Sequence, residues 1–392
     1  MKIALLTPGG VDRSGTERVI PHLLWQIERL ARGGDEVHVF AFNQEPLPGH
    51  WPLLGATVHN AGRKPQLLTL LRLLFAEHRR GSFDILHAFW AMPSGFAGAI
   101  ATHLLRVPLL LTLPGGDLAN HPSIGYGGAI RLRSRLKIRF AAASAAAVTA
   151  PSPAMCDQAS AAGIPAACIP HGVALDRWPQ RAPTRRDPRA PLKLLHIGSL
   201  NLVKDQATML RAVARLRDQG QPFELDVIGE DTLGGAVQRY ASELGLADHV
   251  RFHGFMPHAG LRPWIECADM LLVSSIHEGG PLVVLEAAIA GVPTIGTSVG
   301  HIADFAPDAA IGVPVGDSDA MADAIHRLAT DEEERLRLAH AAQRRAIGKD
   351  ADVTSRRFRR LYAALAARRH AGIPARGADA AILSQTRGGA NV

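Results

Sequence analysis

Apolar runs alternate with helical patterns along the first half of the chain. The runs KIALLT, EVHVFAF and FDILHAF are separated by stretches near residues 17–32 and 65–78 whose apolar residues recur at helical spacing. Further runs follow at PLLLTL, AAVTAPS and AACIPHG. Each run is apolar at successive positions, as parallel strands are when helices cover both faces of their sheet. The first half therefore predicts a doubly wound α/β domain.

The same alternation begins again near residue 192. LKLLHIGS, FELDVIGE, HVRFHGF, DMLLVSS and VPTIGTS are the predicted strands, with helices at about 205–218 and 237–244, near residue 261, and after Pro281. The segment between the halves, residues 179–191, has four prolines, five charges and no hydrophobic periodicity, which is typical of a linker.

This pattern predicts a division of the chain into domains. We expect an N-terminal domain at 1–178, a linker at 179–191 and a C-terminal domain at 192–350. A helix at 351–370 follows, which can pack back on the N-terminal domain, and the Gly- and Ala-rich tail at 371–392 is expected to be disordered.

Composition narrows the class of protein. Hydrophobic residues make up 47% and charged residues 20%, which excludes a chain that is disordered throughout. The net charge of +7 favours anionic partners. Cys156, Cys168 and Cys267 lack the spacing of a zinc site or a disulfide framework. Because no signal sequence or membrane-spanning segment is indicated, we expect a cytoplasmic protein.

The strongest chemical signal is SSIHEGGPLVVLEAAIAGVPTIGTSVG at 274–300, a strand that leads through a Gly-Gly-Pro turn into a helix. Pro281 suits the first helical turn, where its missing N–H is not needed. The N–H groups of Leu282 and Val283 would then point out of the helix N-terminus, and Gly279 and Gly280 would allow a close approach. This arrangement predicts a pocket for phosphate oxygens.

Two carboxylates bracket this turn, because Glu278 precedes the helix and Glu286 lies eight positions further on. Carboxylates accept hydrogen bonds from vicinal hydroxyls, so the pair suits a nucleotide ribose at one end and a sugar at the other. The alternative is that Glu278 only complements the helix dipole and Glu286 is an exposed helix residue. The E-x7-E spacing around Gly-Gly-Pro favours the binding site.

The motifs resemble those of the family 4 retaining glycosyltransferases of the GT-B fold. The resemblance rests on EGGPLVVLEA, GVPTIGT, HIGSLNLVKDQ, HVRFHGFMP and IPHGVALDRW, and it is stronger in the second half. It implies two facing Rossmann-like domains with an interdomain cleft. A hexose would pass, with retention of anomeric configuration, from a UDP- or GDP-sugar to a glycan, lipid-linked or small-molecule acceptor. No cofactor or metal is expected.

The resemblance also implies roles for single residues. Glu286 would hold the ribose, Glu278 the transferring sugar, and Lys204 the charge that grows on the leaving phosphate. Further donor contacts are expected from Gly15, Ser199, Gly254, Phe255, Gly279, Gly280, Pro281, Leu282 and Val283. Considered without the resemblance, Lys204 is better explained as a solvated lysine at a helix start. The alternative for Gly15 is an ordinary turn between strand and helix, and the donor contact is the favoured interpretation.

Three positions depart from the family pattern on the acceptor side. Phe89 stands where a second histidine is common, Pro114 where another histidine is common, and Ser199 where an arginine is frequent. His87 and Asp117 remain as acceptor-side candidates, and His87 is also a candidate catalytic residue. The alternative for His87 is a residue that merely ends its strand.

A basic stretch lies in the first half. No acidic residue occurs from 118 to 156, whereas five cations fall within nine positions: Arg131, Arg133, Arg135, Lys137 and Arg139. As a helix, the stretch would carry an apolar stripe flanked by cations, which suits peripheral contact with an anionic membrane. Its alternation also permits a strand or a solvated basic face. Nucleic acid is disfavoured, because no aromatic residues interleave with the cations.

Other functions remain open at this point. The same architecture could host a catalytically silent sugar-nucleotide-binding protein, a nucleotide-sugar epimerase or a phosphorylase, although no motif places a lysine for pyridoxal phosphate. A dinucleotide oxidoreductase is disfavoured, because no predicted strand is followed by G-x-G-x-x-G.

Overall fold

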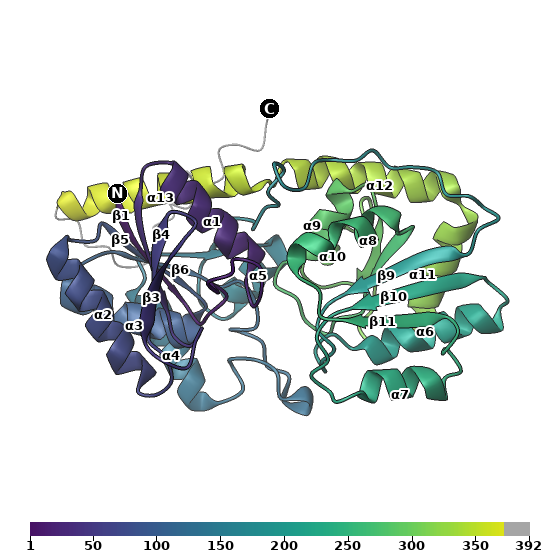
Figure 1. Cartoon of the computed structure of the whole chain (residues 1–392), viewed down its shortest axis with the longest axis horizontal. Helices are drawn as coiled ribbons and strands as arrows, with labels where there is room; N and C mark the ends of the chain where they lie inside the picture. Colours follow the sequence, from purple (N-terminus) through teal and green to yellow (C-terminus); the bar gives the residue numbers. More distant parts are fainter. Residues whose placement is uncertain (372–392) are drawn as a thin grey trace. The chain divides into compact units, whose positions relative to one another are not determined.

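The computed structural model describes residues 1–371 and divides the chain into two compact units (Figure 1). Unit 1 comprises Met1–His171 together with the chain from Ala351 on, and unit 2 comprises Gly172–Asp350. The chain thus leaves unit 1 before the predicted linker and returns to it at residue 351. Of the expected disordered tail, residues 372–392 lie outside the described residues.

Unit 1 is built on an eight-stranded sheet in the order β3-β4-β2-β1-β5-β6-β7-β8. All neighbours are parallel except the hairpin of β3 and β4. The strands are β1 Lys2–Thr7, β2 Glu36–Ala41, β3 Gly49–Leu53, β4 Ala56–Asn60, β5 Ile85–Phe89, β6 Leu109–Thr112, β7 Ala147–Ala150 and β8 Ala167–Cys168.

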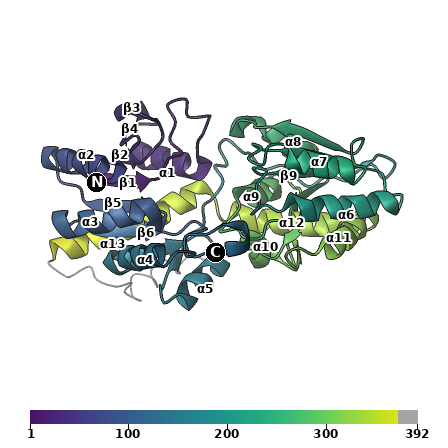
Figure 2. The same cartoon turned by 90° about the horizontal axis from the view of Figure 1, so that it is seen from below.

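Helices cover both faces of this sheet (Figures 1 and 2). One face packs against α1 Pro21–Arg32 and α13 Ala351–His370, through residues such as Ile27 and Phe358. The other face packs against α2 Gln66–Arg80, α3 Phe96–Leu105 and α4 Leu132–Ser144, and α5 Pro153–Ala161 adds to this core. Short turns lie at Ala91–Gly95 and Pro122–Ile124. Because both faces are buried, the strands are apolar at successive positions.

Unit 2 contains six parallel strands in the order β11-β10-β9-β12-β13-β14. They are β9 Leu192–Ile197, β10 Phe223–Ile228, β11 Val250–Gly254, β12 Met270–Val273, β13 Thr294–Thr297 and β14 Ile311–Val313. The helices are α6 Gln206–Asp218, α7 Ala236–Glu243, α8 Arg262–Cys267, α9 Leu282–Ile289, α10 Gly300–Phe305, α11 Ser318–Thr330 and α12 Glu332–Ile347, with a 3-10 turn at His258–Gly260.

The Pro-rich segment 179–191 forms neither helix nor strand, but it is held against unit 2. Arg335 donates to the carbonyl oxygen of Thr184 at 2.6 Å, and the backbone N–H of Arg186 donates to Glu332 at 3.0 Å. These contacts fix an extended path along α12. Among residues 1–371, no helix is both long and apolar enough to cross a membrane.

Buried neutral histidines predict a pH-dependent stability. Burial lowers the pKa of His22 and His196 to about 4 and that of His87 to about 3, whereas histidine in an unfolded chain titrates near 6.5. Between these values the unfolded state binds more protons, so each histidine lowers the free energy of unfolding as pH falls, by up to about 1.4 kcal/mol per pH unit. Asp117, whose pKa burial raises to about 7, acts in the opposite direction.

The test therefore compares variants. Between pH 7 and pH 5 the thermal midpoint of His196→Gln should fall by less than the thermal midpoint of the wild type. His326→Gln changes an exposed histidine of α11 in the same unit and should follow the wild type. Equal pH dependence in all three proteins would show that burial does not hold His196 neutral.

Candidate functional site

The site in unit 2 lies at the carboxyl ends of two adjacent parallel strands. The helices that follow these strands lie on opposite faces of the sheet. Strands β9 and β12 are neighbours, and β9 leads to α6 whereas β12 leads to α9. Helix α6 belongs to the large core on one face, and α9 packs with α12 on the other. Such a switch point leaves a crevice beyond the carboxyl ends of the strands, where ligands bind in open α/β sheets.

The two loops at this crevice are joined by backbone and side-chain contacts. The N–H of Ile276 donates to the carbonyl oxygen of Val203 at 2.8 Å, and the hydroxyl of Ser274 donates to the carbonyl oxygen of Lys204 at 2.8 Å. The Lys204 ammonium contacts Glu278 Oε1 at 2.5 Å, and the same oxygen accepts from Ser275 at 2.6 Å. The structure therefore brings the predicted lysine and the first predicted glutamate together.

Helix α9 begins at the end of the loop that contains Glu278. It begins at Leu282, directly after Pro281, whose φ is −64°. The first N–H groups of a helix have no intrahelical partner and carry the positive end of its dipole. A Cβ added at Gly300 would lie 2.9 Å from Pro281 Cδ and 3.0 Å from Glu278 Cβ. Gly300 therefore packs closely against this turn, and no side chain would fit at position 300.

The second predicted glutamate is in the interior of unit 2. Glu286 is only 2% exposed, and its Oε1 contacts His258 Nε2 at 2.5 Å. The His258 ring lies 5.2 Å from the ring of Trp178. Gly254 and Phe255 precede His258 on the loop after β11, where Gly254 has a φ of +70° and Phe255 is exposed. The alternative of an exposed helix glutamate is therefore wrong.

His258 was missed by the sequence analysis. Its position in HVRFHGFMPH, four residues after a glycine already assigned to the site, was the available signal. The partner Glu286 is distant in sequence, and only the folding of the β11 loop toward α9 joins them.

Ser199 lies on the loop after β9, and its carbonyl oxygen accepts from the Gln206 side chain at 3.1 Å. This loop approaches the loop after β10 so closely that a Cβ added at Gly229 would lie 2.0 Å from the Gly198 oxygen. The carboxyl-edge loops of β9, β10 and β12 are consequently close-packed, which makes the crevice largely preformed.

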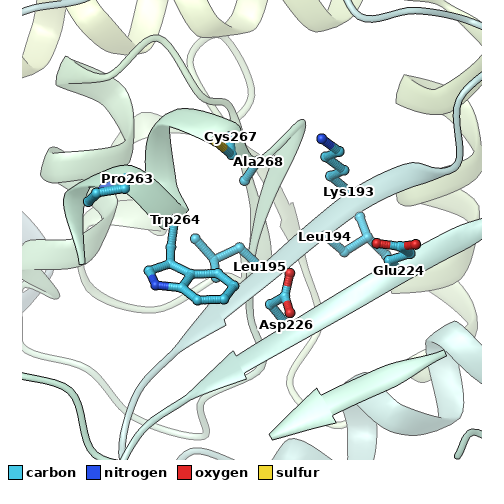
Figure 3. Close-up of a pocket in the computed structure, with 9 residues that line it drawn as sticks. All are labelled: Lys193, Leu194, Leu195, Glu224, Asp226, Pro263, Trp264, Cys267 and Ala268. Atoms are coloured by element: carbon cyan, nitrogen blue, oxygen red, sulfur yellow. The ribbon is translucent and has the colours of Figure 1, made fainter. Parts of the chain in front are cut away.

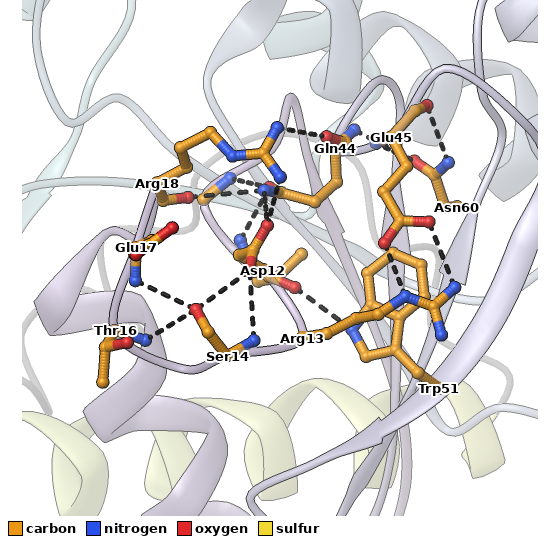
Figure 4. A network of polar contacts seen from close by, with 12 residues as sticks. Asp12, Arg13, Ser14, Thr16, Glu17, Arg18, Gln44, Glu45, Trp51 and Asn60 are labelled. Carbon is orange, nitrogen blue, oxygen red and sulfur yellow. Dashed lines mark hydrogen bonds and ion pairs between the residues drawn. The ribbon is translucent and has the colours of Figure 1, made fainter.

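In unit 1, Gly15 lies on the loop after β1 and has a φ of +66°. Asp12 organises this loop by accepting from the N–H and the hydroxyl of Ser14 at 3.0 and 2.9 Å and from Arg18 at 2.5 Å (Figure 4). Burial alone would raise the pKa of Asp12, but the hydrogen bonds from Ser14 and the charge of Arg18 outweigh it and lower the pKa. Gln44 adds a further contact at 3.3 Å.

The proposed catalytic role of His87 is wrong for this structure. His87 is fully buried, and its ring nitrogens contact the Tyr362 hydroxyl at 2.6 Å and the Thr112 hydroxyl at 2.7 Å. Burial lowers its pKa to about 3, so it stays neutral. Phe89 is likewise buried. His87 joins α13 to the sheet, and its role is structural.

Asp117 is close to the loop that follows β5. Its Oδ1 accepts from the N–H of Ala91 at 2.8 Å, and its Oδ2 has no hydrogen-bond partner. Burial raises its pKa to about 7 despite the backbone hydrogen bonds it accepts. Asp117 therefore fixes the turn at Ala91–Gly95, and its second carboxyl oxygen is buried without a partner.

A separate cavity of about 340 Å³ lies on the face of the sheet in unit 2 (Figure 3). Its walls include Lys193 and Glu224, the second residues of β9 and β10, and Trp264 of α8. It thus opens toward the amino ends of the strands, whereas Lys204 and Glu278 lie beyond the carboxyl ends. None of the predicted site residues lines this cavity.

One group within residues 1–371 has the composition of a metal site, namely His38, His59 and Glu77 of unit 1. The Lys2 ammonium, however, lies 2.8 Å from Glu77 Oε1 and already neutralises that carboxylate. His38 and His59 contact each other at 3.0 Å. An ion-pair cluster explains this group, and we assign it no metal.

Two family models match consecutive parts of the chain. The Glycosyl transferase 4-like domain matches residues 19–172, and Glycosyl transferases group 1 matches residues 176–345. These ranges correspond to the two compact units. Each half of the chain is therefore similar to a glycosyltransferase domain.

A glycosyltransferase of Bacillus subtilis named for teichuronic acid biosynthesis, TuaC, is 28% identical over 62% of the chain. The match spans 61% of TuaC, less than two thirds of that relative. Among solved structures, the sucrose-phosphate synthase of Thermosynechococcus elongatus has a TM-score of 0.78 at 18% identity, covering 93% of this chain and 99% of that one.

HepE of Anabaena, solved with UDP-glucose, has a TM-score of 0.71 at 19% identity and covers 93% of this chain and 100% of its own. At such low identity the solved structures bear on the fold alone. The predicted fold class, two Rossmann-like domains of the GT-B type, is confirmed by these similarities.

The close packing of Gly300 against the turn at Glu278 can be tested by mutation. Gly300→Ala should lower the thermal midpoint and speed hydrogen exchange of residues 275–286, because the new Cβ meets Pro281 and Glu278. Gly220→Ala is the matched control, since Gly220 also has a positive φ but no atom within 4 Å of an added Cβ. Both variants carry a backbone strain of about 1 kcal/mol. Equal exchange in the two variants would contradict this close packing.

Proposed function

We propose that this protein transfers a hexose from a UDP- or GDP-sugar to an acceptor with retention of anomeric configuration. The proposal rests on one observation: Lys204, Glu278 and the start of α9 meet at the carboxyl edge of unit 2. A cation, a carboxylate and unpaired N–H groups are the chemistry that a sugar diphosphate requires.

The diphosphate binds at the N-terminus of α9. The N–H groups of Leu282 and Val283 and the Lys204 ammonium donate to its oxygens, and Gly279 and Gly280 leave room for it. In the free protein Glu278 balances the charge of Lys204. When the diphosphate takes over that balance, Glu278 accepts hydrogen bonds from the sugar hydroxyls.

The nucleoside lies toward the loop after β11. Glu286 accepts hydrogen bonds from the ribose hydroxyls while His258 orients its carboxylate. Phe255 offers an exposed ring near the base, and Gly254 offers backbone atoms. The HepE structure with UDP-glucose supports this donor class, because that protein shares the fold.

Transfer needs placement and charge stabilisation more than an acid-base pair. The bond from the anomeric carbon to the phosphate oxygen breaks, and its electron pair leaves with the diphosphate, whose charge Lys204 stabilises. The acceptor oxygen bonds to the same face of the sugar, and its proton passes to the departing phosphate. We assign no enzymic nucleophile, and no metal or cofactor is required.

Unit 1 supplies the acceptor side in this proposal. Gly15 stays a predicted donor contact, and Asp117, whose buried Oδ2 has no hydrogen-bond partner, stays the acceptor-side candidate. The acceptor is a glycan, a lipid-linked sugar or a small molecule. Within residues 1–371 none of the three cysteines forms a disulfide, which suits a cytoplasmic location.

The two glutamates should separate donor binding from transfer. Glu286→Ala removes the ribose contact, so the Kd for a nucleoside diphosphate should rise about 10- to 100-fold. Glu278→Ala should leave that Kd within a few-fold and lower kcat for sugar transfer by about 100-fold. Calorimetry with UDP and GDP measures the first effect, and release of nucleoside diphosphate with a candidate acceptor measures the second.

Glu243→Ala, on the exposed face of α7, is the matched control and should match the wild type in both assays. Normal binding and turnover in both site variants would refute the site assignment. A wild-type protein that binds nucleotide but releases none with any acceptor would instead be a silent sugar-nucleotide-binding protein, and an epimerase would change the sugar without transferring it.

A further inference from the structure

Helix α4 presents an apolar stripe to solvent. Leu132, Leu136 and Phe140 are 69%, 58% and 41% exposed, and their spacing of four places them in one row along the helix. The buried residues of α4 are Ile138 and Ala141. With about 100° between successive helical residues, the exposed row lies on the side opposite the buried one. The stripe therefore points directly away from the core.

The neighbouring helix extends this surface. Helix α3 packs against α4, with the Phe96 and Phe140 rings 5.9 Å apart, and Leu104 in its last turn is 65% exposed. Ten large apolar side chains are exposed among residues 1–371, and four of them lie on these two helices. Surface helices normally turn a polar face outward. The concentration of exposed apolar residues on α3 and α4 therefore indicates an interaction surface.

Cations flank the stripe on both sides. By the same helical step, Arg133 and Lys137 lie on one side, whereas Arg135 and Arg139 lie on the other. Among the described residues, none of these four forms an ion pair, and neither does Arg131 at the start of the helix. No acidic residue occurs from 118 to 156. Arg135 donates to the carbonyl oxygen of Ala129, and the Lys137 ammonium lies 5.1 Å from the centre of the Phe96 ring. Within the described residues, however, no carboxylate neutralises these cations.

We propose that α4 docks on a membrane surface that contains anionic phospholipid. The cations contact lipid phosphates while Leu132, Leu136 and Phe140 enter the boundary between headgroups and acyl chains. A flat, negatively charged surface with an apolar layer beneath it matches an apolar row with cations along both sides. An acidic protein or a nucleic acid would satisfy the cations but would leave the row of leucine and phenylalanine exposed.

The position of α4 connects this docking to the acceptor. Helix α4 follows β6, so its first turn lies at the carboxyl edge of the sheet in unit 1. Asp117 lies on the segment between β6 and α4. A docked α4 would hold this edge near lipid headgroups, which selects a lipid-linked acceptor. This last step rests on the proposed transferase function, whereas the docking itself rests on α3 and α4.

Vesicle sedimentation tests the docking with the full chain. Wild-type protein should bind vesicles of phosphatidylcholine with about one third phosphatidylglycerol at least 10-fold more strongly than pure phosphatidylcholine, and salt should weaken this binding. Leu132→Ser with Leu136→Ser should reduce binding at least 10-fold. Leu47→Ser with Leu68→Ser, two exposed leucines elsewhere in unit 1, should leave it within two-fold.

Charge is tested in the same way. Arg133→Gln with Lys137→Gln should reduce binding at least 10-fold, whereas Arg72→Gln with Arg79→Gln on the exposed side of α2 should have little effect. Equal binding to both vesicle types, or normal binding by the α4 variants, would overturn the proposal. Binding of an oligonucleotide that competes with vesicles and needs Arg133 and Lys137 but not Leu132 would also overturn it.

A second measurement separates docking from catalysis. With a water-soluble acceptor, the α4 variants should release nucleoside diphosphate at the wild-type rate, and with a lipid-linked acceptor in vesicles they should be slower. Vesicle binding without any transfer by the wild type would refute the proposed function and leave the docking in place. Transfer without vesicle binding would refute the docking alone.

Discussion

The contact between Lys204 and Glu278 is the interaction on which the site in unit 2 depends. Both side chains are largely withdrawn from water, at 25% and 12% exposure. Removing one partner from such a pair is costly, because it leaves the other charge poorly solvated. The two loops beyond β9 and β12 are therefore held together in the absence of a ligand. An anionic ligand can replace Glu278 as the partner of Lys204 without leaving a bare charge.

Two further contacts in unit 2 hold the surroundings of this ion pair in place. Gly300 keeps the turn before α9 in place, and the contact of Glu286 with His258 ties the interior of α9 to the loop after β11. The three loops and the helix start thus form one preformed surface at the carboxyl edge. Among the residues of unit 1 that the structure describes, no comparable cation-carboxylate pair lies beyond β5, where His87 is buried and Asp117 points its bonded oxygen toward the backbone.

The sequence predicted most of the fold, because buried parallel strands and amphipathic helices leave clear periodicities. The hairpin of β3 and β4 was not predicted. Its two-residue turn places Leu54 and Gly55 at φ values of +52° and +83°. Asparagine or aspartate normally marks such a turn, and leucine gives no signal. Helix α3 was also missed, because its Ala- and Gly-rich sequence continues the apolar run before it.

Some residues of the site could be predicted from the sequence and others could not, for a physical reason. Glu278 and Glu286 flank a glycine-rich turn whose local geometry the sequence reveals, whereas Lys204 was expected only from the family resemblance. The two histidines contact partners that are distant in the chain: His87 contacts Tyr362, and His258 contacts Glu286. Only the fold shows that His87 is buried in a core and that His258 lies beside the site. The choice between a helix and a strand for the basic stretch was decided in the same way, since α4 is a helix whose outward row is apolar.

A crystal structure with bound UDP is the most direct test of the central claim. We predict that phosphate oxygens lie within about 3 Å of the Lys204 ammonium and of the N–H groups of Leu282 and Val283, with Glu286 on the ribose. A diphosphate bound elsewhere, for example in the cavity beside Lys193 and Trp264, with the Lys204–Glu278 contact unchanged, would contradict the account.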